Sequence, residues 1–348
     1  MASIKEIAAA AEVSIGTVDR VLHNRGRVKP ETAERVRQIA KELGYVPDEI
    51  GKALAIKKKK LNIGFMIPSS EQAPSEFYED VKKGAMTETE NLKKYDITVI
   101  FYPILFDFET GEDVYPVLTE EEWSELDGLV TLGGNSEQLQ FILDEAERRK
   151  IPVTLYNMKA DQGKYLAVVQ CDYEKAGRMA AGLAAFMTGE KGKVGILSMD
   201  SDKVPSYVGR CNGFIHEIHN FYPDMEIVFN EVLKSDNYTA DHSNKVADLL
   251  GKSPQVDLIY VINPGNYRIF DAIRNSNDGK KRYVLTNDLT SKQRELVLNG
   301  EISMTISQDP ESQGKKALRL LGDYLIYGQK PDTRVCYTNL TVHFKQNI

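Results

Sequence analysis

The sequence predicts a small all-α head followed by a larger α/β domain, which consists of two lobes that each contain a doubly wound parallel sheet. Residues 1–45 hold three short amphipathic segments with helix start and stop signals. From Leu61 onward, strand-like apolar runs alternate with amphipathic helical runs. Strands of almost unbroken apolar residues, each followed by a helix, are typical of parallel sheets covered on both faces. About ten such units exceed the eight of a closed barrel, so two lobes fit better.

The three head helices are indicated by their caps. Ser3 begins a capping box, and Ser14 is a good N-cap for a second helix over about 15–23. Pro30 suits the first turn of a third helix that ends at Gly44. The inward positions expected for the second helix are Val18, Val21 and Leu22.

Charge is divided unevenly along the chain. Residues 1–60 hold 13 Lys and Arg against 8 Asp and Glu, a net charge of +5. Residues 61–348 hold 31 against 43, a net charge of −12. A basic head on an acidic body favours an anionic partner, such as nucleic acid, for the head alone, although scattered surface charge gives the same split.

Composition narrows the class of protein further. Three cysteines, odd in number and far apart, indicate reduced thiols rather than a disulfide framework. No apolar run approaches the roughly 20 residues of a membrane span. The first ten residues lack the basic-then-apolar pattern of a signal peptide, so we expect a cytoplasmic protein with no membrane partner.

Enzyme motifs are incomplete. The "GKS" at 251–253 has Val246 where a phosphate-binding loop needs glycine. His216 and His219 share a helix face, but no nearby cysteine or carboxylate completes a zinc site. We therefore expect no catalysis, no metal and no cofactor.

Two helices joined by a tight break, the second of them capped, form the helix-turn-helix arrangement. The segments "IAAAAEVSIGTVDRVL", "VKPETAERV", "ELGYVP" and "ALA" follow in order, and over them the chain resembles the DNA-binding head of the LacI/GalR transcription regulators. The resemblance implies a DNA-binding domain at 1–46, a hinge helix and basic linker at 47–60, and an effector-binding and dimerisation domain at 61–348.

Residue roles in the head follow from this resemblance. It gives base reading to Ile15, Gly16 and Arg20, and phosphate contacts to Ser3, Ser14, Thr17 and His23. It brings Tyr45 and Pro47 towards the minor groove and makes Leu54 the side chain that wedges between base steps. Local capping is the alternative for Thr17, a surface position for His23, and a buried anchor on the next domain for Leu54. Gly16 and Asp19 depart from the usual family residues, so we expect a distinct operator.

The rest of the chain resembles the periplasmic-binding-protein-like type I effector domain of the same family. The segments that carry this resemblance include "VVQCDYEKAGRMAAGLAAF", "YVGRCNGF", "YVINPGN", "VLTND" and "ISMTISQDPESQGKKAL". The expected lobe 1 holds about 61–168 and 309–333, and the expected lobe 2 holds about 169–308 and 334–348. Such folds bind a small polar ligand between the lobes.

The effector contacts come from the same match and from the chemistry of these side chains, since carboxylates and amides hydrogen-bond hydroxyl groups and arginine offers a donor fork. The expected contacts are Phe77, Tyr78, Tyr156, Asn157, Asp172, Arg210, Asn263, Asp288 and Gln308. Helix capping is the alternative for Asp172 and Asp288, a salt bridge for Arg210, and lobe core for Phe77 and Tyr78. Pro264 and the Tyr156–Asn157 pair depart from ribose-type sites, which makes ribose itself doubtful.

The sequence therefore predicts a ligand-responsive transcription regulator, most simply a repressor, that binds double-stranded operator DNA as a homodimer and responds to a sugar or sugar derivative. An activator of the same family is one alternative. A sugar-binding transport receptor and a hydrolase or kinase on the same lobes are alternatives of other classes. The basic head disfavours the receptor, and the incomplete motifs disfavour the enzymes.

Overall fold

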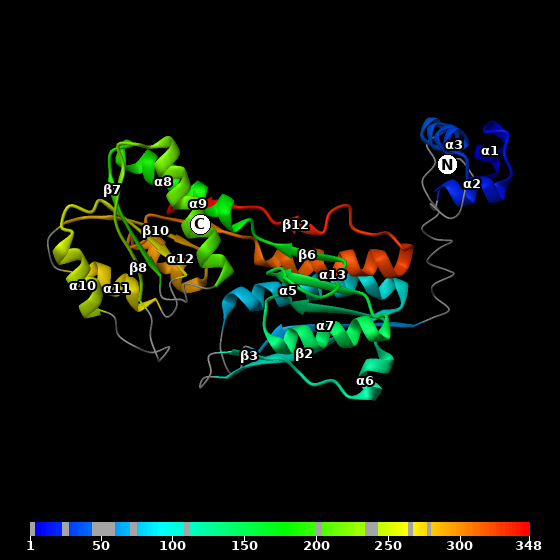
Figure 1. Cartoon of the computed structure of the whole chain (residues 1–348), viewed down its shortest axis with the longest axis horizontal. Helices are drawn as coiled ribbons and strands as arrows, with labels where there is room; N and C mark the ends of the chain where they lie inside the picture. The colour runs from blue at the N-terminus through cyan, green and yellow to red at the C-terminus, as the bar shows by residue number, and fades with distance from the viewer. Residues whose placement is uncertain are drawn as a thin grey trace. The chain divides into compact units, whose positions relative to one another are not determined.

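The computed structural model describes residues 4–22, 28–43, 60–69, 75–107, 112–198, 204–233, 243–263, 267–276 and 280–348. The chain divides into two compact units, Met1–Lys58 and Lys59–Ile348. Figure 1 traces the elements of each unit in chain order.

The head contains the three predicted helices, α1 (Ile4–Ala10), α2 (Ile15–Leu22) and α3 (Pro30–Glu42). Their inward residues form one small core that includes Ile7, Val18, Val21 and Val36. The break between α1 and α2 passes through Glu12, whose φ of 51° lies in the left-handed region. This conformation turns the chain sharply enough for α2 to pack on α1.

Lobe 1 is built on a seven-stranded sheet with the order β12-β6-β5-β4-β1-β2-β3. Its strands are β1 (Leu61–Pro68), β2 (Ile97–Asp107), β3 (Glu112–Val114), β4 (Gly128–Leu132), β5 (Val153–Asn157), β6 (Ala167–Gln170) and β12 (Val335–Tyr337). All pairs are parallel except β2 with β3, which are antiparallel. The helices of this lobe are α5 (Glu76–Leu92), α6 (Glu120–Glu125), α7 (Glu137–Arg149) and α13 (Pro310–Tyr327), with a 3-10 turn at Lys93–Tyr95.

Lobe 2 is built on a six-stranded sheet with the order β13-β11-β10-β9-β7-β8. Its strands are β7 (Lys193–Ser198), β8 (Glu226–Val232), β9 (Leu258–Ile262), β10 (Tyr283–Asn287), β11 (Met304–Ser307) and β13 (Thr341–His343). Only β13 runs antiparallel to its neighbour. The helices are α8 (Tyr173–Thr188), α9 (Pro205–Phe221), α10 (Ser243–Lys252), α11 (Arg268–Arg274) and α12 (Ser291–Leu298).

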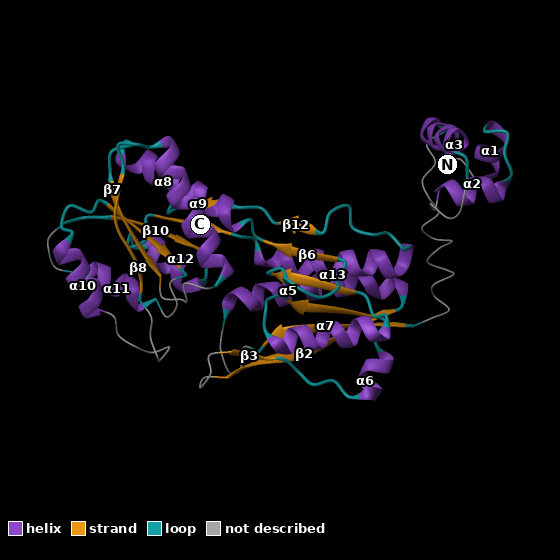
Figure 2. Cartoon of the chain, viewed as in Figure 1, coloured by secondary structure: helices purple, strands orange, loops and turns teal. Residues whose placement is uncertain are grey.

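The lobe 2 sheet is covered on both faces, as the unbroken apolar strands predict. One core cluster joins the strands to α8 and α9, and a second joins them to α10, α11 and α12. Figure 2 shows the strands in orange between purple helices. The predicted architecture of two doubly wound lobes is confirmed.

Glycine pairs let two pairs of helices cross closely. A methyl group on Gly84 of α5 would lie 1.8 Å from the carbonyl oxygen of Glu311, and one on Gly314 of α13 would lie 2.0 Å from that of Val81. In lobe 2, a methyl group on Gly177 of α8 would lie 2.0 Å from the carbonyl oxygen of Arg210 on α9. No other residue type permits such a close approach of backbones.

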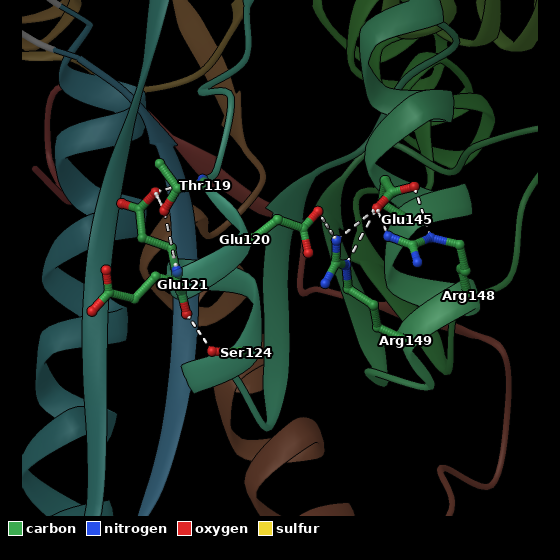
Figure 3. A network of polar contacts seen from close by, with 8 residues as sticks. Thr119, Glu120, Glu121, Ser124, Glu145, Arg148 and Arg149 are labelled. Atoms are coloured by element: carbon green, nitrogen blue, oxygen red, sulfur yellow. Dashed lines mark hydrogen bonds and ion pairs between the residues drawn. The ribbon is translucent and has the colours of Figure 1, made fainter.

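Helix α6 is fixed to α7 by an arginine. Arg149 contacts Glu120 at 2.6 Å and Glu145 at 3.2 Å (Figure 3). Its guanidinium carbon also lies 5.5 Å from the Trp123 ring centroid. The side chain of Thr119 accepts a hydrogen bond from the Glu122 amide and caps α6. These contacts order the outer helices of lobe 1.

Three crossings between the lobes lie in the described part of the chain. Residues 171–172 lead from β6 to α8, residues 308–309 lead from β11 to α13, and residues 338–340 lead from β12 to β13. We expected 334–348 to belong to lobe 2, but β12 pairs with β6 in the lobe 1 sheet. The third crossing therefore follows Tyr337, because the strand that ends there completes sheet 1.

The acidic stretch 105–118 breaks the strand–helix rhythm and predicts a surface loop, which the structure corrects in part. Residues 105–107 extend β2 and pair with β3, whereas residues 115–118 have no regular structure and residues 108–111 lie outside the described residues. The antiparallel ladder includes Asp113, and burial there raises the pKa of this carboxyl above its usual value.

Candidate functional site

Helix α2 presents a polar face to solvent. Ile15 is 50% exposed, and Gly16 and Arg20 are also exposed, whereas Val18 is buried in the head core. The Ser14 hydroxyl oxygen accepts a hydrogen bond from the Thr17 amide at 3.1 Å, which confirms the predicted N-cap. The residues assigned to base reading thus lie on the accessible part of α2.

Arg20 lies back along its own helix. Its Nε donates to the carbonyl oxygen of Gly16 at 3.0 Å. A methyl group on Gly16 would lie 3.8 Å from the Arg20 guanidinium, an ordinary contact distance, so packing does not require glycine here. The absent side chain instead leaves this part of the helix surface to Arg20.

The other head residues divide into two groups. The Thr17 hydroxyl lies 2.9 Å from that of Ser14, so Thr17 takes part in the local cap. The remaining predicted DNA contacts, Ser3, His23, Tyr45 and Leu54, lie outside the described residues, as do Pro47 and most of the basic linker. Their roles stay predictions.

Strand ends from both lobes supply the predicted effector residues. Asn157 ends β5 in lobe 1, while Asn263, Asp288 and Gln308 follow β9, β10 and β11 in lobe 2. Three of them adopt left-handed backbone conformations, with φ of 67° at Asn157, 50° at Asn263 and 70° at Asp288. Asn and Asp tolerate this region better than most residues, and such strain often concentrates at binding sites.

Arg210 is the central charge of this cluster. It is only 2% exposed, and its Nη1 donates to Asn263 Oδ1 at 2.7 Å. Asn263 in turn donates to the Ser206 hydroxyl at 2.9 Å. The Arg210 Nε has no partner within the described part of the chain. Burial lowers the pKa of this guanidinium, but Asp288 and other nearby groups outweigh burial and hold the pKa above its usual value.

Asp288 is paired with an amide rather than with a helix end. Gln308 Nε2 donates to Asp288 Oδ1 at 2.8 Å. The next helix, α12, is capped by Thr290, so the capping alternative for Asp288 does not hold. Asp172 behaves differently, because its Oδ1 accepts from the Lys175 amide at 3.0 Å and caps α8.

The predicted aromatic contacts do not all join the cluster. Phe77 and Tyr78 begin α5 and lie edge to face, with ring centroids 5.2 Å apart. Tyr78 joins the cluster through its hydroxyl, which lies 3.4 Å from Asn157 Nδ2. Tyr156 is completely buried, donates to the Met66 carbonyl oxygen at 3.0 Å, and packs inside lobe 1 rather than at the cluster.

Sequence reasoning missed Tyr173, which links the two lobes. Its hydroxyl donates to the Asn157 carbonyl oxygen at 2.9 Å and lies 3.0 Å from Asn157 Oδ1. The Arg210 guanidinium carbon lies 5.2 Å from the Tyr173 ring centroid, within the range of a cation–π contact. Burial raises the Tyr173 pKa well above its usual range, which keeps the hydroxyl protonated as a donor. The sequence signal that could have identified Tyr173 is an aromatic residue directly after residues 171–172, the first crossing.

Cys171 is a free thiol, as predicted for the three cysteines. It is fully buried in the first crossing, where burial raises the pKa of its thiol to about 12. A thiol with that pKa stays protonated at neutral pH and is unreactive. Cys171 therefore packs in the first crossing as a small buried side chain.

A small cavity opens beside the cluster. It measures about 210 Å³ and is lined by Phe77, Asp80, Asp288, Leu289, Thr290, Arg294, Ser307 and Pro310. Its lining comes from α5 and α13 of lobe 1 and from the end of β11, the loop after β10 and helix α12 of lobe 2. This volume is below the roughly 300 Å³ of drug-sized sites, so it suits only a small ligand.

Within the described residues, no group of three His, Cys, Asp or Glu side chains could hold a metal ion. No helix of that part of the chain is both long and apolar enough to cross a membrane.

Comparisons with known proteins agree with this organisation. The chain is 32% identical over 163 residues to the HTH-type transcriptional regulator RegA of Clostridium acetobutylicum, covering 46% of this chain and 45% of RegA. It is 27% identical over 175 residues to catabolite control protein A of Priestia megaterium, covering 50% of this chain and 48% of that protein. The chain thus spans about half the length of these curated relatives.

A solved structure matches the larger unit. The arabinose binding protein AraP of Geobacillus stearothermophilus superposes with a TM-score of 0.67 at 20% identity, covering 83% of this chain and 98% of AraP. At this identity the likeness shows the fold alone.

Family assignments cover both units. Residues 65–330 match the periplasmic binding protein domain, and residues 3–48 match the bacterial regulatory proteins of the lacI family. Together with the helix-turn-helix head and the two doubly wound lobes, these matches show that the chain belongs to the periplasmic binding protein domain family and carries the DNA-binding head of the lacI family of bacterial regulators.

Proposed function

We propose that this chain is a sequence-specific DNA-binding transcription regulator, acting in the cytoplasm as a homodimeric repressor, whose operator affinity is controlled by a small sugar-like effector bound between its lobes. The single observation that carries the proposal is the joining of a lacI-family head to a two-lobed domain with a buried polar cluster at the lobe boundary. The names of the relatives RegA and catabolite control protein A support regulation.

The head has the chemistry for reading a duplex. The net charge of +5 over residues 1–60, head and linker together, favours phosphate binding, and the accessible face of α2 carries Ile15 and Arg20. Arginine bonds guanine edges and apolar side chains contact thymine methyl groups in the major groove. One short helix reads only a few base pairs, so two heads on a two-fold symmetric operator supply the remaining specificity.

The polar cluster has the chemistry for binding hydroxyl groups. Arg210 and Gln308 offer N–H donors, while Asp288 offers carboxylate oxygens. Because these side chains and Asn157 come from both lobes, an effector that bonds all of them favours one lobe arrangement over another. A ligand shifts such an equilibrium only by its differential affinity for the two arrangements.

Operator binding is tested by selection from a random duplex library. The full chain should enrich a two-fold symmetric sequence, whereas residues 59–348 alone should enrich nothing. Enrichment by the truncated protein would contradict the proposal.

Effector binding is tested by thermal unfolding in the presence of sugars, sugar acids and polyols. A bound effector raises the melting temperature by mass action. The same compound should change operator affinity of the full chain. A transport receptor is the alternative suggested by the likeness to AraP. It would show the thermal shift both in the full chain and in residues 59–348, and it would not bind operator.

A further inference from the structure

Gln308 is held at the lobe boundary by side chains from several directions. It is 5% exposed and lies in the second crossing, where its Nε2 donates to Asp288 at 2.8 Å. Its carbonyl oxygen accepts from the Thr338 hydroxyl at 2.7 Å. From α13 of lobe 1, Gln313 Nε2 lies 3.4 Å from both the carbonyl oxygen and Oε1 of Gln308. Thr338 and Gln313 thus share the main-chain carbonyl of Gln308, while Asp288 and Gln313 contact the nitrogen and the oxygen of its side-chain amide.

Gln313 is a destabilising choice of residue at its buried position. It is completely buried, and its Oε1 has no partner within the described residues. A buried amide with an unsatisfied oxygen destabilises a fold compared with an apolar side chain of similar size. Packing alone would therefore favour leucine at position 313, so the hydrogen bonds of the Gln313 amide N–H group are what distinguish glutamine from leucine here.

These hydrogen bonds set the orientation of Gln308. An amide group can rotate by half a turn, which exchanges its oxygen and its nitrogen. The Asp288 carboxylate only accepts hydrogen bonds, and the Gln313 nitrogen only donates them. With nitrogen toward Asp288 and oxygen toward Gln313, both contacts are favourable, and in the reversed orientation both are repulsive.

We propose that Gln313 is a positioning residue for the effector site. Acting from lobe 1, it holds the Gln308 side-chain amide so that its second N–H and the second oxygen of Asp288 face a hydroxyl-bearing effector, while Thr338 fixes the Gln308 main-chain carbonyl. Helix α13 packs on β4, β5 and β6, so lobe 1 is linked to effector binding through Gln313. This inference rests on the proposed function for its effector, but the contacts themselves are testable without one.

The first experiment uses no effector. Gln313 and Thr338 contact the same carbonyl oxygen, so their substitutions should not be additive. In the full chain, Thr338→Val should lower the melting temperature by about 2–4 °C. The same change in a Gln313→Leu background should lower it further, because the buried Gln308 carbonyl then has neither partner. Additive shifts would overturn the inference.

The second experiment separates positioning from packing. Gln313→Leu alone should keep or raise the melting temperature, since it removes the unsatisfied oxygen. The same variant should bind the probe sugars D-arabinose, D-allose and D-galactose about tenfold more weakly, as expected for loss of one uncharged hydrogen bond. Ser312→Ala, one residue earlier in the same turn, is the matched control and should change neither quantity.

The outcomes distinguish this inference from the proposed function. If no probe sugar stabilises the wild type, the sugar-effector proposal loses support, while the double-substitution experiment still decides whether Gln313 bonds the Gln308 main-chain carbonyl. If the wild type binds a probe and Gln313→Leu binds it equally well, the positioning role is overturned and the proposed function stands.

Discussion

Arg210 is the residue on which the effector hypothesis depends most. A buried charge is tolerated only where partners compensate for the loss of water. Here Asn263 accepts from it, Tyr173 lies under it and Asp288 raises its pKa. A bound effector with hydroxyl groups would add acceptors for the donors that remain.

Replacement of Arg210 by methionine tests this at similar side-chain volume. We expect Arg210→Met to abolish the thermal shift caused by effector while operator binding persists, because the head is a separate unit. Asp288→Ala should behave alike. The control is Arg178→Met, whose guanidinium pairs with Glu217 at the surface of lobe 2. An unchanged effector titration in Arg210→Met would refute the site assignment.

Ser14 caps α2 and is predicted to contact a DNA phosphate, and substitution can separate these two roles. As N-cap of α2 it contributes about 1 kcal/mol to helix stability, so Ser14→Ala should weaken both the head and its operator binding. Ser14→Asp keeps a capping oxygen but adds a negative charge. We expect it to fold normally and to bind operator less than Ser14→Ala does, because the charge repels phosphate. Circular dichroism melting and fluorescence anisotropy measure the two properties.

If Ser14→Asp binds operator as well as the wild type, Ser14 lies away from the phosphates and acts only as a cap. The role of Ser14 would then be purely structural, and its predicted phosphate contact would be wrong.

At the scale of elements, the crossing of α8 and α9 positions the effector cluster. Tyr173 begins α8 and Arg210 lies on α9, and the two helices meet through Gly177 and Gly213. A methyl group on Gly213 would lie 2.1 Å from the carbonyl oxygen of Glu174. Because backbone atoms cannot yield by that much, any side chain here must separate the helices and with them Tyr173 and Arg210.

Two alanine substitutions on α8 test this. Gly177→Ala should destabilise the effector unit by about 1–3 kcal/mol, as overpacking does, and should weaken the effector response. Gly182→Ala on the same helix meets only the Tyr222 hydroxyl, at 3.7 Å, and should stabilise it by up to about 1 kcal/mol. Denaturant unfolding measures both. Equal effects of the two substitutions would contradict the close-crossing argument.

At the scale of the whole molecule, the charge asymmetry bears on the proposed binding to DNA. Residues 1–60 carry +5 and the remaining chain −12, so attraction to a duplex would come from the head and its linker. Each phosphate contact that releases a counterion steepens the salt dependence of binding by roughly 0.9 in the logarithmic slope. Lys57–Lys60 are the densest positive charge in the sequence.

Replacement of Lys57–Lys60 by glutamine should therefore weaken operator binding at low salt and reduce its logarithmic salt slope. Fluorescence anisotropy over a range of potassium chloride concentrations measures the slope. Lys292→Gln, an exposed lysine of the effector unit paired with Glu295, should leave it unchanged. If the salt slope is unchanged in the fourfold variant, these lysines do not contact phosphates and form a solvated tether.

Local signals in the sequence were sufficient for the head and for the class of the larger unit. The Ser14 cap, the inward Val18 and Val21, and the unbroken apolar strands act over a few residues, so they can be read directly. Resemblance to a known family added Arg210, Asn263, Asp288 and Gln308, and the structure brings these side chains into one hydrogen-bonded or electrostatic cluster.

The sequence by itself determined a basic helix-turn-helix head and two doubly wound lobes, because caps, periodicity and charge are properties of neighbouring residues. Only the tertiary structure decided that β12 completes sheet 1, that Tyr173 joins Asn157 to Arg210, and that Gln313 restrains Gln308. These contacts depend on how the crossings and glycine-paired helices pack. Partners from separate elements, such as Gln308 and Thr338, leave no periodic trace in the sequence.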